Sequence, residues 1–154
     1  MRHQLTLSAL LLCVLAVSVQ AKGWRGIVPL HSTRADVVRI LGRPNLAGDR
    51  YELERETVSI LYSDGPCRTG GWNVPKDTVI DIMTEPDDDL PLSDLLPDLS
   101  RFTKKQDYEL LDAYHYTNGS EGFEVVVLDG LVRNVFYRPT PKDARLKCRG
   151  AARD

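Results

Sequence analysis

One stretch decides the fold of this chain: Phe123-Glu124-Val125-Val126-Val127-Leu128-Asp129-Gly130-Leu131-Val132-Arg133-Asn134-Val135-Phe136-Tyr137. Its two arms, 123–128 and 131–137, are rich in valine and aromatic residues, which favour β-strands. They flank Asp129-Gly130, and an Asp-Gly pair between such runs is the strongest short-range signal for a β-hairpin. We therefore predict an antiparallel hairpin that ends before Pro139.

Four more segments outside this hairpin have the composition of strands. Arg55-Glu56 should join the first two, Pro86 should end the third, and the turn pair Asn118-Gly119 follows the fourth. The polar residues 104–112 favour neither helix nor strand. The expected sheet therefore has about six strands, namely the hairpin together with residues 51–54, 57–63, 78–84 and 114–117.

A helix is expected ahead of the first strand. The sequence Thr33-Arg34-Ala35-Asp36 has the pattern of a capping box, in which the first and fourth residues bond each other's backbone. Val37, Ile40 and Leu41 follow on one helical face. Gly42 should then end the helix. Two to three turns are not stable alone, so this face is expected to pack on the sheet.

The second half of the chain loosely repeats the order of the first. Residues 92–102 are apolar but contain Pro97, which predicts a short or broken helix ahead of the later strands. The halves are 25–86 and 90–140. The predicted fold is α+β: an antiparallel sheet of about six strands with one or two short helices packed on one face, arranged as two helix-plus-meander units in a single mature domain, 22–154.

The first 21 residues have the pattern of a signal peptide. Arg2 and His3 provide a positive start, and residues 5–19 are almost continuously apolar. Val19-Gln20-Ala21 then places small residues where signal peptidase cleaves, so cleavage is expected after Ala21. This pattern predicts a secreted or periplasmic protein.

Two other interpretations of this apolar run carry less support. Cys13 could be a lipid-attachment cysteine, but three leucines precede it where such sites have small residues. The run is also shorter than the roughly 20 apolar residues of a membrane span. No transmembrane segment is therefore expected.

Cys67 and Cys148 are the cysteines that follow the expected cleavage site. In an oxidising compartment they should pair within the chain. That disulfide would close a loop of roughly 80 residues and contribute about 4–5 kcal/mol in the chain-entropy treatment. Two free thiols, or a disulfide between two chains, are the alternatives.

The charge balance limits the classes of partner. The chain has 20 lysines and arginines against 22 acidic residues, a formal net charge of −2, and no basic cluster. Nucleic acids and anionic membrane surfaces attract strongly basic patches. Neither is therefore an expected partner.

The sequence contains no recognisable catalytic, cofactor-binding or metal-binding motif. His31 lies beside the helix cap and His115 between two tyrosines, so surface or packing roles are expected for both. The acidic run 87–89 lacks the alternate spacing and the glycine of a calcium loop, which indicates a solvated connector. Asn118-Gly119-Ser120 matches a glycosylation sequon, although Asn-Gly is equally a turn pair.

The loop Gly70-Gly71-Trp72-Asn73-Val74-Pro75 is the candidate binding loop. An aromatic residue and an amide, Trp72 and Asn73, on a glycine-rich turn are typical of a binding tip. The alternative is that Trp72 covers one end of the core and that the glycines only permit the turn.

Residues 30–44, Leu-His-Ser-Thr-Arg-Ala-Asp-Val-Val-Arg-Ile-Leu-Gly-Arg-Pro, resemble a known family signature. They are similar to the cap, helix and Leu-Gly-x-Pro segment of the BamE (SmpA/OmlA) outer-membrane-assembly lipoproteins and of the β-lactamase-inhibitor-like fold grouped with them. The resemblance implies a small helix-on-sheet module that makes protein contacts and is not an enzyme. BamE proteins are lipid-anchored, whereas this chain has no recognisable lipid-attachment site.

A second resemblance extends over most of the chain. Gly65-Pro66-Cys67, the Gly-Trp-Asn-Val-Pro run at 71–75 and Leu146-Lys147-Cys148 are similar to motifs of exported proteins from soil bacteria that have no assigned activity. This resemblance supports export and implies no reaction.

Two functional hypotheses result. The first is a secreted or periplasmic non-catalytic binding or adaptor module for another exported protein or an envelope component. The alternative is a small extracytoplasmic hydrolase. Its site would need a pocket that gathers His31 or His115 with two carboxylates. The sequence does not predict the oligomeric state.

Overall fold

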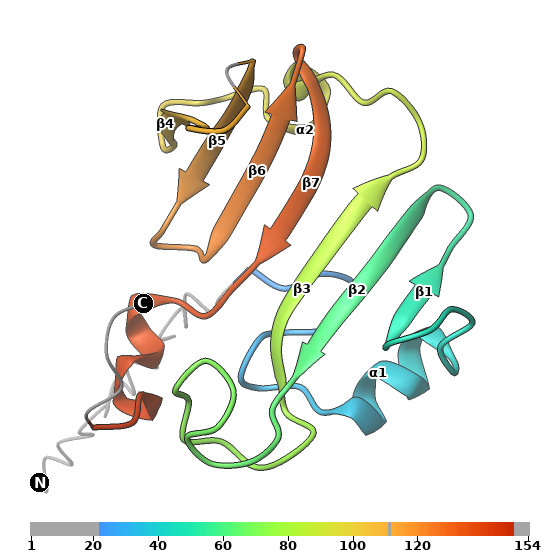
Figure 1. Ribbon diagram of the computed structural model, residues 1–154, viewed down its shortest axis with the longest axis vertical. Coiled ribbons are helices and arrows are strands. Elements are labelled where there is room, and N and C mark those ends of the chain that lie inside the picture. Colours follow the sequence, from blue (N-terminus) through green and yellow to red (C-terminus); the bar gives the residue numbers. More distant parts are fainter. Residues whose placement is uncertain (1–21, 111, 150–154) are drawn as a thin grey trace, which may run out of the picture.

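The computed structural model describes residues 22–110 and 112–149, and in that part of the chain it forms a seven-stranded antiparallel sheet (Figure 1). The predicted α+β class is therefore confirmed. The predicted signal peptide, 1–21, lies outside the described residues. The strands are β1 (Arg50–Glu52), β2 (Glu56–Tyr62), β3 (Val79–Pro86), β4 (Thr103–Gln106), β5 (Ala113–Asn118), β6 (Phe123–Leu128) and β7 (Leu131–Tyr137).

The strand order is β1-β2-β3-β7-β6-β5-β4, so the last strands of the two halves, β3 and β7, meet at the centre of the sheet. Figure 1 shows the two groups of strands side by side, β1 to β3 in green and β5 to β7 in orange. A helix precedes each group: α1 (Arg34–Leu41) and the single turn α2 (Leu92–Leu95). This order agrees with the arrangement of two helix-plus-meander units.

One face of the sheet is covered and the other is open. Buried residues alternate with partly exposed ones along β2 and β6, as expected for an antiparallel sheet that is solvated on one side. The register places Val58, Ile60 and Val125 on the same face as their partners Thr84, Ile82 and Val135. The opposite face, called the open face below, includes Ser59, Leu61, Asp81, Met83, His115, Glu124 and Phe136.

Two apolar clusters form the core on the covered face. The first packs Val37 of α1 and the loop residue Ile27 against β1, β2 and β3, and both side chains are fully buried. The second packs Leu96, which follows α2, against β6 and β7. Each helix, with the residues beside it, therefore covers its own half of the sheet. Neither helix is long enough to be stable without that burial.

Helix α1 begins and ends at the predicted residues. Asp36 Oδ2 accepts a hydrogen bond from the Thr33 N–H at 2.9 Å, and the Thr33 side chain accepts one from the Asp36 N–H, which completes the capping box. Gly42 caps the other end at φ 84°. The predicted apolar face is only partly correct. Val37 is buried and Leu41 packs on the first cluster, but Ile40 is 38% exposed.

The structure differs from the sequence prediction at three places. The polar segment 104–112, which favoured neither state, includes three of the four residues of β4, and all four are exposed, because an edge strand needs no apolar side chains. Pro86 does not end the third strand but is its last residue and pairs with Glu56. A short 3₁₀-helix, η1 (Pro141–Leu146), was not predicted and follows the hairpin.

Cys67 and Cys148 are joined in a disulfide, with Cα atoms 5.7 Å apart. Backbone hydrogen bonds flank this link, from the Asn73 N–H to the Leu146 carbonyl and from the Cys148 N–H to the Gly71 carbonyl. The chain end, red in Figure 1, is thereby fastened to the loop after β2. No helix in the described residues is both long and apolar enough to cross a membrane.

Candidate functional site

Five side chains of alternating charge form a continuous line of ion pairs on the open face, called the charge chain here. Three come from strands β3, β6 and β5, and the other two directly follow β7 and β4. In order, they are Asp81 of β3, Arg138 directly after β7, Glu124 of β6, His115 of β5 and Asp107 directly after β4.

His115 is held on both sides of its ring. Its Nδ1 lies 2.9 Å from Glu124 Oε1, and its Nε2 lies 3.0 Å from Asp107 Oδ2. The bond to Glu124, followed by the bond to Asp107, raises the pKa of His115 because each favours the charged ring. Both ring nitrogens are thus occupied by carboxylates, which fits an imidazolium cation.

Asp107 links the charge chain to the turn between β4 and β5. Its second oxygen, Oδ1, accepts hydrogen bonds from the N–H groups of Glu109 at 2.7 Å and Leu110 at 3.1 Å. The bond to His115 and these two backbone bonds lower the pKa of Asp107 to about 2. One carboxylate therefore fixes both the ring of His115 and the shape of the turn.

Arg138 connects the other end of the charge chain. Its guanidinium donates to Glu124 Oε2 and, at 3.3 Å, to Asp81 Oδ2, and it lies 4.4 Å above the Phe136 ring. Burial raises the pKa of Asp81, and the charge of Arg138 opposes that effect. Asp81 Oδ1 is buried and has no hydrogen-bond partner among the described residues.

A hollow lies at each end of the charge chain. The β2–β3 hollow, about 290 Å³, is lined mainly by apolar groups: Ser59, Ile60, Leu61, Asp81, Met83 and Phe136. The β4–β5 hollow, about 470 Å³, is lined by polar, charged and aromatic residues, whose side chains contribute both polar and apolar atoms: Lys105, Gln106, Asp107, Tyr108, Glu109, His115, Thr117 and Glu124. Two rim residues are conspicuously exposed, Leu61 at 50% and Tyr108 at 99%.

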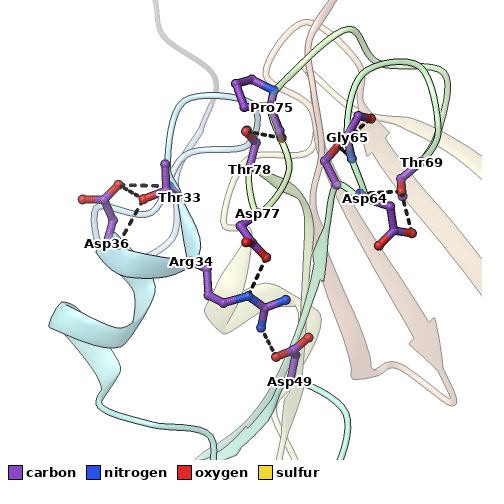
Figure 2. Close-up of polar contacts among 11 residues, drawn as sticks. Thr33, Arg34, Asp36, Asp49, Asp64, Gly65, Thr69, Pro75, Asp77 and Thr78 are labelled. Carbon is purple, nitrogen blue, oxygen red and sulfur yellow. Dashed lines mark hydrogen bonds and ion pairs between the residues drawn. The ribbon is translucent and has the colours of Figure 1, made fainter.

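A second polar cluster surrounds Arg34 and connects three parts of the fold. Figure 2 shows the Arg34 side chain reaching from the first turn of α1 to lie between Asp77 and Asp49. Its Nε donates to Asp77 at 2.9 Å, and its guanidinium lies 3.8 Å above the Tyr62 ring. Both aspartates have left-handed backbones, at φ 65° and 58°. One arginine thus fastens α1, the turn before β1 and the turn before β3.

The predicted binding loop does not present Trp72 to solvent, as a binding tip would. Trp72 is only 8% exposed and packs with Leu30, Val74 and Ile80 in a third apolar cluster. The alternative interpretation, in which Trp72 covers one end of the core, therefore describes this residue. Asn73 is exposed, and its backbone N–H bonds η1.

The remaining residues singled out in the sequence have structural surroundings. His31 Nε2 lies 3.2 Å from Asp143 Oδ1, and this contact links the residues that precede α1 to η1. Asn118 is 4% exposed and accepts a hydrogen bond from Ser120. Residues 87–89 are exposed. Among the described residues, no three histidine, cysteine or acidic side chains are grouped to hold a metal ion.

Sequence reasoning missed the charge chain for identifiable reasons. The hydrolase hypothesis required two carboxylates near His31 or His115 but named neither carboxylate. His115 was otherwise assigned from its neighbours Tyr114 and Tyr116, although strand alternation puts it on the other face from both. The hairpin register would then have brought Glu124 toward the same face. Asp107 could not be placed, because it lies in the polar segment 104–112, which favoured neither state.

Comparison of this chain with protein-family models, with curated proteins and with solved structures gives no match.

Proposed function

We propose that this protein is an exported, non-catalytic binding or adaptor module whose open face holds an envelope component or another exported protein. One observation carries the proposal. The helices and all three apolar clusters leave the open face uncovered, and that face has exposed Leu61 beside partly exposed Met83 and Phe136.

The layout of the open face supports recognition. Apolar side chains surround the β2–β3 hollow, and the charge chain runs from it across four strands. Specific interfaces combine an apolar centre with polar groups at the rim. Because each charge in the chain is already hydrogen-bonded, its side chains are held in place before a partner arrives, which lowers the entropic cost of binding.

The expected compartment agrees with this role. A disulfide between Cys67 and Cys148 is typical of proteins in oxidising compartments, and the predicted leader would deliver the chain there. The proposal therefore places the binding partner outside the cytoplasm.

The test is retention of an envelope component by the immobilised mature chain. Leu61→Glu introduces a charge into the apolar part of the open face and should reduce retention at least about tenfold, a loss of about 1.4 kcal/mol. Val38→Glu is the matched control, because Val38 is similarly apolar and 37% exposed but belongs to α1. Equal retention by both variants and the wild type would contradict the proposal.

Hydrolysis is the second candidate, and one observation favours it. The β4–β5 hollow gathers His115 with Asp107 and Glu124, the combination that a histidine-and-carboxylate site requires. A general base, however, needs a free ring nitrogen, and both nitrogens of His115 lie against carboxylates. We therefore expect no turnover of chromogenic ester or glycoside substrates. Turnover that His115→Gln abolishes would favour the hydrolase.

A further inference from the structure

The β4–β5 hollow differs from the apolar hollow at the other end of the charge chain. His115 lies at its floor between two carboxylates, and the side chain of Thr117, two residues along β5, lines the same side. Tyr108 stands at its rim. The groups that line this hollow therefore include an aromatic ring, a hydroxyl and ion-paired carboxylates.

The charges inside this hollow compensate one another. His115 bonds both Asp107 and Glu124, and Glu124 also bonds Arg138. At the rim, Lys105 and Glu109 carry opposite signs. Because the cation and anions of the floor are already paired with each other, an ionic ligand finds no unpaired opposite charge there. A neutral ligand needs none.

The same groups can still bind hydroxyls. Each carboxylate oxygen has two acceptor sites, so Glu124 Oε1 and Asp107 Oδ2 can accept a further hydrogen bond besides that from His115. The Thr117 hydroxyl both donates and accepts. Hydrogen bonds to charged groups are stronger than those between neutral groups. The floor of the hollow therefore suits a ligand with several hydroxyl groups.

Tyr108 adds an apolar platform. Its side chain is 99% exposed, whereas Asp107 beside it is anchored by two backbone N–H groups and by His115. A tyrosine ring offers a large contact area at low conformational cost, with a polar tip. Its flat face matches the C–H face of a sugar ring, and a sugar presents hydroxyls around that face.

We infer that the β4–β5 hollow binds a neutral oligosaccharide, with one sugar ring stacked on Tyr108 and its hydroxyls bonded to Thr117 and the carboxylates beside His115. The inference rests on the proposed function, since it names the ligand class for one end of the open face. Neutral glycans fulfil both requirements, hydroxyl groups and absence of charge. A charged peptide segment does not fulfil the second.

The test is a titration of the ¹⁵N-labelled mature chain with four hexasaccharides: neutral maltohexaose, cellohexaose and hexa-N-acetylchitohexaose, and acidic hexagalacturonate. At least one neutral probe should shift the amide signals of Tyr108, His115 and Thr117. Tyr108→Ala should weaken that binding about tenfold, and Tyr108→Phe should retain it, because the stacking face is kept. Leu110→Ala is the matched control on the same turn and should bind like the wild type.

Three results separate this inference from the proposed function. If no neutral probe shifts these signals, or only hexagalacturonate does, the inference is wrong. If in that case Leu61→Glu still abolishes retention of an envelope component, the proposed function stands with another partner. If neither the glycans nor the envelope component binds, both are wrong.

Discussion

Single side chains on the open face are fixed by ionic contacts more than by burial. His115 is 32% exposed and Asp107 26% exposed, yet each makes at least two directed hydrogen bonds. Such pairs contribute little free energy individually, but a connected series restricts where each side chain can lie. The charge chain therefore fixes the positions of these side chains more than it adds to the free energy of unfolding.

The His115 pairs should make stability depend on pH with a defined sign. The pKa of His115 is raised in the fold, so its contribution is complete below about pH 6.5 and is lost as the pH rises through the folded value. The pKa of Asp107 is lowered to about 2, so its contribution is present above about pH 4 and is lost as the pH falls toward 2.

His115→Gln should therefore destabilise the protein most between about pH 4 and 6.5, on the order of 1 kcal/mol. Urea unfolding of the wild type and the variant over a pH series measures this difference. A matched series of His31→Gln separates the effect of this histidine from that of the other one in the described residues. A difference that grows above about pH 8 would contradict the assigned pairs.

The backbone of Gly122 packs closely against the backbone of Arg138. It has φ 64°, and a Cβ there would lie 2.0 Å from the Arg138 carbonyl oxygen. Gly130 has a similar φ of 80° but has nothing within 4 Å of the corresponding position. Both substitutions with alanine incur the left-handed backbone cost of about 1–2 kcal/mol, and only the first adds a collision.

Gly122→Ala should therefore cost at least about 2 kcal/mol more than Gly130→Ala in chemical denaturation. The crowding should also disturb the amide signals of residues around Arg138 and Glu124. Equal costs for the two variants would mean that the backbone contact between Gly122 and Arg138 is not as close as described.

At the scale of elements, the described fold follows from local signals wherever those signals agree with the tertiary contacts. The Asp129-Gly130 hairpin and the capped helix α1 have the predicted limits within a residue or two. Strand β4 and helix η1 were not predicted, because their formation depends on contacts distant in sequence. β4 is a strand only by pairing with β5, and η1 is fastened by Cys148 and by His31.

The candidate site was predictable to a smaller extent than the fold. The Trp72 loop was singled out as a candidate because glycines beside an exposed aromatic residue and an amide would form a binding tip, but the pairing of that loop with the chain end buries the ring. The charge chain has no local signature, since three of its members come from three different strands and the other two directly follow β7 and β4. Only the sheet register brings them together.

The cap of α1 offers a test at this scale. Thr33→Ala removes the hydroxyl that accepts the Asp36 N–H and should cost about 1 kcal/mol of unfolding free energy, measured in urea. Thr33→Ser keeps the hydroxyl and is the control, with a change of only a few tenths of a kcal/mol expected. An alanine variant as stable as the wild type would show that α1 is held by packing alone.

On the scale of the whole molecule, the disulfide holds the chain end over the third apolar cluster. Leu146 packs beside Trp72, and Lys147 Nζ lies 4.8 Å above the same ring. Replacing Cys67 and Cys148 with serine should cost about 2–5 kcal/mol. The third cluster should open before the sheet does, because the sheet keeps its own two clusters.

Tryptophan fluorescence can follow this opening in a Trp24→Phe background, where Trp72 is the reporter. In the double serine variant, the emission should shift to the red at a lower urea concentration than the one that removes the β-sheet circular dichroism signal. With the disulfide intact, the two transitions should coincide. Coincident transitions in both proteins would mean that the chain end does not protect Trp72 separately.

The most direct test of the account is photo-crosslinking in the cells that make the protein, with the reactive amino acid placed at Leu61 or, as the control, at Val38. Both positions are exposed apolar sites, but only Leu61 lies on the open face. The account predicts a discrete crosslinked product from position 61 and none from position 38. The same product from both positions, or a product from position 38 alone, would contradict the assignment of the open face as the binding surface.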